Sequence, residues 1–519
     1  MLKFFRQYNK KLIWLDNHIL EYLSFALLIF IPLYPKIPIA DILPGYIVRI
    51  RLDDILVAVA FLIWIIWLLR KKISLKDNPL FIPICLYIIV GLLSSLSAIY
   101  LTKTVPNETL HIGKLFLHFL RRIEYFSVFF IFFSSIKSLT QVKKYIYTVA
   151  IVLLLVSLYG FGQKYLYWPA FSTMNREFSK GVKLYLTEHA RVISTFGGHY
   201  DLAAYLMIVL TLFIPLSLIV KKWFHKLFFL LISAFGFWLL ILTVSRTSFL
   251  AYLVSITVVF GLLILKKGWL WSLSRWFIVL IVSLGIMLSF GDLSDRFSHI
   301  LKMDKLKSAA FSPIKDLPEG PQVAYLDIEF PKSDTPPSSQ KPDQPQKPSD
   351  VYVDIPDSGI YTGTFAAKPR IYSQTSIQYD LSTGIRLDYT WPKAIEGFSK
   401  NPLFGSGYST LTKRNIEDFT EAESTDNDFL RALGETGLLG FITFYGIIAV
   451  VIWYTISNFR KIKDLFYSTI VAALIAATLG LLVNAIYIDV FEASKVAYTF
   501  WILIAILLAT VKLSIQKNK

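Results

Sequence analysis

The sequence predicts an all-α integral membrane protein with about 12 transmembrane helices and a large extracytoplasmic loop between helices 9 and 10. Hydrophobic residues make up 55% of the 519 residues and charged residues only 17%, which is too apolar for a set of soluble domains. The apolar residues form separate runs of about 18 to 25, the length that a helix needs to cross about 30 Å of hydrocarbon. Basic residues follow every second run.

These apolar runs give the predicted spans. In chain order they cover residues 19–39, 55–69, 80–101, 110–136, 145–165, 202–220, 224–244, 247–265, 276–290, 438–457, 466–488 and 496–513.

The charges between the spans predict the orientation. Every even connection is basic, as in Lys71 and Lys72 after span two and Lys266 and Lys267 after span eight. By the positive-inside rule both termini face the cytoplasm and the odd connections face outward. Residues 291–431 carry 16 basic and 21 acidic residues, a net −5, so the formal charge of +17 belongs to the membrane part, and no nucleic-acid partner is expected.

Three parts are predicted along the chain. Residues 1–290 form an N-terminal membrane domain with spans 1 to 9, residues 291–437 the extracytoplasmic loop, and residues 438–519 the last three spans. Within the loop, a Pro-rich insert at 311–350 is expected to be extended, with short strands near 323–330 and 351–364. The motif segment 385–437 starts with an apolar pattern typical of an amphipathic helix on the membrane surface.

Arg246 is the first candidate functional residue, because it occupies a tight outer turn between spans seven and eight. An arginine next to the free N–H groups of a helix start makes a good anion site. The alternative interpretation is an arginine that extends to lipid headgroups.

Arg386 is the second candidate, and it precedes a turn with Gly405 and Gly407. The two glycines permit a tight turn whose backbone amides can line a ligand, although many such turns are only structural.

Asp426 and Asn427 lie just before span ten. Either residue can cap a short helix over 429–433 that ends at Gly434 or Gly437. A carboxylate at the mouth of a membrane cavity is also suited to act as a general base.

Charged residues in span four form a stripe, because Lys114, His118, Arg121 and Arg122 share one helix face. Arg121 would lie about 16 Å deep at about 1.5 Å per residue, where an unpaired charge is costly and Glu124 offsets part of the cost. The alternative is that this outer half lies at the membrane interface.

Arg191 is a lesser candidate at a glycine turn before span six. His189 and His199 lie nearby, but no Asp, Glu or Cys has ligand spacing with them, so no metal is expected. Several outward arginines together indicate an anionic, phosphate-bearing substrate with a lipid tail.

Three motifs together resemble the O-antigen ligase and O-antigen polymerase family of bacterial membrane glycosyltransferases. They are Ser-Arg-Thr-Ser-Phe-Leu-Ala around Arg246, Arg386 followed by Asn-Pro-Leu-Phe-Gly-Ser-Gly, and Asp-Asn-Asp-Phe-Leu-Arg-Ala-Leu-Gly-Glu-Thr-Gly from Asp426. The likeness is clearest over residues 191–488.

The resemblance implies glycan transfer from a polyprenyl-diphosphate carrier to a glycan or lipid acceptor, on the outer face of the bacterial cytoplasmic membrane and without metal or cofactor. Arg246 and Arg386 match the family arginines that hold the diphosphate. Asp426 stands where ligases commonly have a histidine base, as in polymerase-type members, so ligation and polymerisation both stay open. Arg191, Arg121, Arg122, Lys114, Asn427, Gly405 and Gly407 are the expected substrate-binding residues.

Two other function classes remain. A transporter or flippase of lipid-linked oligosaccharide would carry charges through both leaflets, and the sequence has no internal repeat. A non-catalytic scaffold would use the Pro-rich loop to bind an envelope partner.

Overall fold

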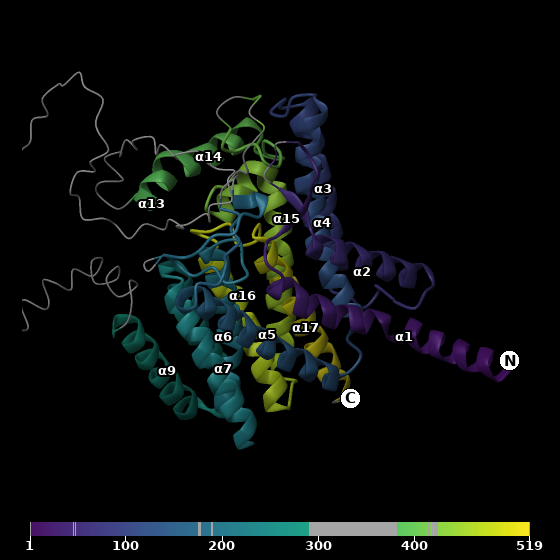
Figure 1. The fold of residues 1–519 in the computed structure, drawn as a ribbon, viewed down its shortest axis with the longest axis vertical. Helices are drawn as coiled ribbons and strands as arrows, with labels where there is room; N and C mark the ends of the chain where they lie inside the picture. The colour runs from purple at the N-terminus through teal and green to yellow at the C-terminus, as the bar shows by residue number, and fades with distance from the viewer. Residues whose placement is uncertain are drawn as a thin grey trace, which may run out of the picture.

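The computed structural model describes residues 2–44, 46, 48–174, 178–187, 190–289, 381–413, 416, 417, 419 and 424–517. These residues are mostly helical (Figure 1). The long helices are α1 (Leu2–Leu33), α2 (Leu52–Leu69), α3 (Phe81–Tyr100), α4 (Thr109–Ser135), α5 (Leu139–Tyr165), α6 (His199–Ile219), α7 (Trp223–Leu242), α8 (Arg246–Lys267), α9 (Trp269–Ser289), α15 (Asp428–Phe459), α16 (Leu465–Asn484) and α17 (Ser494–Lys517).

Each long helix overlaps one predicted span, so the all-α multi-pass membrane fold is confirmed. Within the described residues, eleven helices are long and apolar enough to cross a membrane. The helix outside that group is α4, which carries Lys114, Arg121, Arg122 and Glu124.

Shorter elements connect the long helices. Between α1 and α2, β1 (Pro38–Asp41) pairs with β2 (Arg49–Arg51) in an antiparallel hairpin that the sequence did not predict. A 3-10 turn, η1 (Phe178–Lys180), precedes α6. Before α15 come α13 (Leu381–Ile385), the π-helical turn η2 (Arg386–Thr390) and α14 (Trp391–Lys400). The Pro-rich insert at 311–350 and the strands predicted near 323–330 and 351–364 lie outside the described residues.

The predicted amphipathic helix is present as α14. It buries Ala394 and Gly397 against α15 and leaves Ile395 exposed. Figure 1 shows α13 and α14 together on one side of the bundle, next to the start of α15.

The centre of the bundle is formed by α6, α16 and α17, whose residues are mostly buried. By contrast, α1, α2 and α9 are the least buried of the candidate spans and lie at the periphery (Figure 1). Lipid tails are as apolar as these side chains, so close van der Waals packing between the central helices, rather than removal from water, stabilises the core.

The short connection between α16 and α17, residues 485–493, joins several distant segments. Asn484 Nδ2 donates to Ser248 Oγ in the first turn of α8 at 3.0 Å, and the Asp428 amide donates to the Ala485 carbonyl at 2.9 Å. The starts of α8 and α15 therefore lie at the same end of the bundle, here named the site end.

The opposite end of the bundle gathers basic residues. Lys266, at the end of α8, donates from Nζ to the Ile462 carbonyl at 2.7 Å in the turn between α15 and α16. Two of the basic even connections of the sequence therefore lie together, away from Arg246 and Asp428.

Candidate active site

The segment before α15 is fixed by one carboxylate. Asp489 accepts hydrogen bonds from the backbone N–H groups of Thr425 at 3.0 Å and Asn427 at 2.9 Å. It also accepts from the hydroxyls of Ser424 and Thr425 and from Arg431 Nη1. Five donors to one buried carboxylate hold this segment against the connection between α16 and α17.

The sequence left open which residue caps α15, and the structure assigns the cap to Asn427. Its side-chain oxygen accepts from the Leu430 amide at 2.9 Å. Asp426 has a left-handed backbone with φ of 50° and makes no cap. Its carboxylate is therefore available for another role.

Asp426 instead forms an ion pair with Arg386, with 3.1 Å between Oδ2 and Nη2. The same Nη2 donates to the Tyr487 carbonyl at 3.1 Å, and the guanidinium lies over the Tyr487 ring at 5.7 Å. Burial raises the pKa of the Asp426 carboxyl above its ordinary value, although Arg386 acts in the opposite direction. Arg386 and Asp426, which the sequence analysis selected from separate motifs, thus form an ion pair.

Arg246 begins α8 directly after Ser245, which caps that helix by accepting from the Ser248 amide. Ser248, in the first turn of α8, is hydrogen-bonded to Asn484, and Arg386 is hydrogen-bonded to Tyr487. The start of α8 and Arg386 therefore both contact the segment where α16 ends and the connection to α17 begins. Arg246, Arg386 and Asp426 thus belong to segments that all meet residues 484–489.

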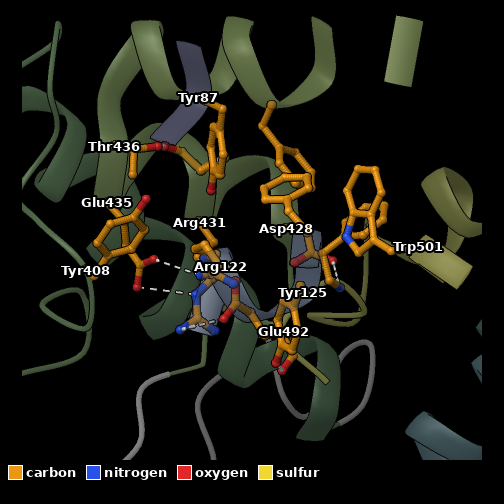
Figure 2. A pocket seen from close by; sticks show the side chains of 14 residues that line it. Tyr87, Arg122, Tyr125, Tyr408, Asp428, Arg431, Glu435, Thr436, Glu492 and Trp501 are labelled. Carbon is orange, nitrogen blue, oxygen red and sulfur yellow. Dashed lines mark hydrogen bonds and ion pairs between the residues drawn. The ribbon is translucent and has the colours of Figure 1, made fainter. Parts of the chain in front are cut away.

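Beside this segment lies a buried network of arginines and carboxylates, seen in Figure 2. Arg122 pairs with Glu492 and lies 3.8 Å from Glu435. Arg431 lies 3.3 Å from Glu435, 3.9 Å from Glu492 and 2.9 Å from Asp489. Buried charges are stable only when paired in this way, so loss of one member leaves a costly charge behind.

The surroundings of Glu492 favour its charged form. Burial by itself would raise the pKa of Glu492, but Arg122 and Arg431 hold it below its ordinary value. Glu492 is therefore charged and binds both arginines.

The turn with Gly405 and Gly407 packs on α15. Both glycines have positive φ, 71° and 95°, and a Cβ on Gly405 would lie 2.5 Å from backbone atoms of Glu435. The amides of Ser406 and Gly407 donate to the carbonyls of Gly434 and Glu435 at 2.8 Å. The sequence left open whether the amides of this turn line a ligand or are structural; here these two hold the turn on α15.

The turn also orients Glu435. The Ser409 amide donates to Glu435 Oε1 at 2.9 Å, and α15 is interrupted just beyond by Gly437, with φ of 66°. The glycine turn thus sets the position of a carboxylate in the arginine network.

The charged residues of the α4 stripe lie in three different surroundings. Arg121 binds Asp54 at 2.6 Å and Glu124 at 2.8 Å, which confirms that Glu124 compensates the buried arginine, whereas Arg122 points into the network of Figure 2. Lys114 lies over the ring of Tyr46 at 5.5 Å.

Arg191 lies next to the first turn of α6. It binds His199 Nε2 at 2.6 Å, in the first turn of α6, and lies over the ring of Tyr200 at 6.0 Å. Its contacts thus hold the segment before α6 in place. His189 lies outside the described residues.

Three charged residues that the sequence analysis did not select are central here. Asp489, Glu492 and Lys495 follow one another at intervals of three in an otherwise apolar stretch. Lys495 is buried and donates to the carbonyls of Pro32, Tyr34 and Thr195. These residues could have been recognised in the sequence from the regular spacing of their charges between two predicted spans, where an unpaired charge is costly.

Comparison with known proteins adds one match. Residues 227–445 match the family model described as O-antigen ligase, and the matched range contains Arg246, Arg386 and Asp426. No curated protein matches the chain. The match confirms the resemblance that the motifs indicate, and residues 227–445 of this chain form a domain of the O-antigen ligase family.

Proposed function

We propose that this protein transfers a glycan from a polyprenyl-diphosphate carrier to an acceptor hydroxyl on the outer face of the bacterial cytoplasmic membrane. The family domain supports O-antigen ligase-type glycan transfer in surface polysaccharide biosynthesis. The observation that carries the proposal is the 3.1 Å ion pair between Arg386 and Asp426 at the site end of the bundle.

Arg246 and Arg386 hold the diphosphate of the donor. Guanidinium groups stay charged and bind phosphate oxygens in a bidentate way. At the start of α8 the helix adds free N–H groups and its positive dipole end to Arg246. Both arginines stabilise the negative charge that develops on the leaving diphosphate, which is the charge that a metal ion would otherwise neutralise.

Asp426 acts as the base. The acceptor oxygen attacks C1 of the donor sugar, the bond between C1 and the phosphate oxygen breaks, and its electron pair leaves with the lipid diphosphate. The hydroxyl proton moves to Asp426, whose raised pKa suits proton transfer. When the diphosphate draws Arg386 away, Asp426 loses its counter-ion and becomes a stronger base.

The orientation follows from the distribution of charge. Lys266, Lys267, Arg460 and Lys461 gather at the end of the bundle opposite Asp426. By the positive-inside rule that end and both termini face the cytoplasm, so the site end faces outward.

Replacement of Arg386 tests the proposal in cells that lack the natural copy. Arg386→Ala should abolish the surface glycan, and Arg386→Lys should restore little of it because lysine cannot bind phosphate in a bidentate way. Intact mass analysis of the accumulating lipid-linked glycan then identifies the reaction. Single units indicate a polymerase and long chains indicate a ligase, whereas unchanged surface glycan contradicts the proposal.

A further inference from the structure

A large cavity lies next to the proposed base. Its volume is about 590 Å³, and it lies between α2, α4 and the connection between α16 and α17. Ser424 lines it, and the Ser424 hydroxyl contacts Asp426 Oδ1 at 3.0 Å and Asp489 Oδ2 at 2.9 Å. Neither Arg246 nor Arg386 is among its lining residues.

One flank of the cavity is apolar. It is formed by Val57, Ala58 and Phe61 of α2 and by Leu117, Leu120 and Ile123 of α4. Leu120 lines the cavity and is also 53% exposed, so the cavity is not sealed from the surface of the bundle. Because α2 is a candidate membrane span, this flank suits a hydrocarbon chain.

The other flank carries charges of both signs, and its carboxylates outnumber its cations: it holds the four cations Lys36, Arg51, Arg121 and Arg431 and the five carboxylates Asp54, Glu124, Asp201, Asp489 and Glu492. Arg121 is paired with Asp54 and Glu124, and Arg431 with Asp489 and Glu492. An anionic diphosphate gains little from arginines that already hold two carboxylates each. The hydroxyl groups of a sugar both donate and accept hydrogen bonds, so a sugar can bind to this flank, which offers donors and acceptors side by side.

We propose that this cavity binds the acceptor, a glycan carried on a lipid. Its terminal sugar lies on the charged flank, with one hydroxyl directed toward Asp426 past Ser424, and its lipid chain lies along α2 and α4. The inference rests on the proposed function and deepens it, because donor diphosphate and acceptor sugar then have separate binding places that share Asp426.

Narrowing the apolar flank tests the inference without touching the charged groups. Ala58→Trp places an indole at the open edge of the cavity, because Ala58 lines the cavity and is exposed, whereas Leu62→Trp, one turn further along α2 and 59% exposed, places the same group outside the lining. The rate of glycan transfer is measured in proteoliposomes. The acceptor concentration is first varied at saturating donor, and the donor concentration is then varied at saturating acceptor.

Ala58→Trp should raise the KM for a lipid-linked acceptor by about tenfold or more and leave the KM for the donor within about twofold. Leu62→Trp should behave as the wild type. For a water-soluble acceptor glycan without the lipid, Ala58→Trp should have little effect. An unchanged acceptor KM, a raised donor KM, or equal losses for both acceptors would overturn the placement.

A binding measurement separates failure of this inference from failure of the proposed function. A photoreactive amino acid at position 120 should crosslink a labelled lipid-linked glycan, and Ala58→Trp should suppress the crosslink, while position 62 gives none. Wild-type protein that forms no glycosidic bond refutes the proposed function. Absence of the crosslink at position 120 refutes the cavity assignment, whatever the transfer result.

Discussion

The carboxylate of Asp489 accepts a hydrogen bond from the backbone N–H of Asn427 at 2.9 Å, across 62 residues of chain. Asn427 belongs to the matched O-antigen ligase domain, whereas Asp489 lies beyond its last residue, 445. The connection between the last two helices therefore holds Asp426, the proposed base, in position.

Asp489→Asn should weaken both stability and transfer. An amide replaces one acceptor oxygen by a donor, which leaves at least one buried backbone N–H, of Thr425 or Asn427, without a partner at a cost of about 1–3 kcal/mol and removes a charged partner of Arg431. Thermal unfolding and transfer rates check this. The control, Asp77→Asn, breaks an exposed ion pair with Lys512 and should change stability by no more than about 1 kcal/mol.

Arg386→Ala should lower kcat/KM by about 10²- to 10³-fold, since it removes a guanidinium proposed to bind the leaving diphosphate. Arg70→Ala removes an arginine from an exposed ion pair with Asp16 and should keep the wild-type rate. Equal activity of the two variants in a steady-state assay would exclude Arg386 from the donor site.

The pH profile should report on Asp426. The base must be deprotonated, so kcat/KM should fall as pH drops through a pKa above the ordinary 3.8. Because Arg386 lowers this pKa, Arg386→Gln should move the acidic limb of the residual activity to higher pH. A limb that stays in place would mean that another group is titrating.

Stability should depend on Glu492 at low pH. Its pKa in the folded protein is below the ordinary 4.5, so its contribution is full above pH 4.5 and is lost as pH falls below it. Glu492→Gln should lower Tm at neutral pH and flatten this decline. Glu396→Gln, in an exposed pair with Lys393, should change Tm little.

Gly405→Ala should destabilise the site end by about 1–3 kcal/mol, because the residue has φ of 71° and a Cβ would lie 2.5 Å from the backbone of α15. Gly446→Ala, in α15, meets no atom within 4 Å and should be neutral or stabilising. Denaturation curves for the two variants provide the comparison.

The sequence predicted the membrane helices well, because span length is set by bilayer thickness and apolar runs are directly visible. The three motifs could also be identified in the sequence, because their polar residues stand out beside apolar spans. It could not choose between Asp426 and Asn427 as the cap of α15, since both residue types cap helices equally well.

The network around Asp489 and Glu492 could not be derived in the same way. Their partners Arg122 and Arg431 are far away in the sequence, and only helix packing brings them together. The role of the glycine turn was also hidden, because its amides bind carbonyls of α15 that no local pattern identifies. The β1–β2 hairpin was missed because its strands have only four and three residues.

The central claim is that the protein forms a glycosidic bond with Asp426 as the base. Purified protein in proteoliposomes, given a labelled polyprenyl-diphosphate glycan and an acceptor, should produce the elongated or ligated glycan by mass spectrometry, and Asp426→Asn should reduce its rate by at least about 10²-fold. Movement of the lipid across the bilayer without a new bond, or an undiminished rate in Asp426→Asn, would contradict the account.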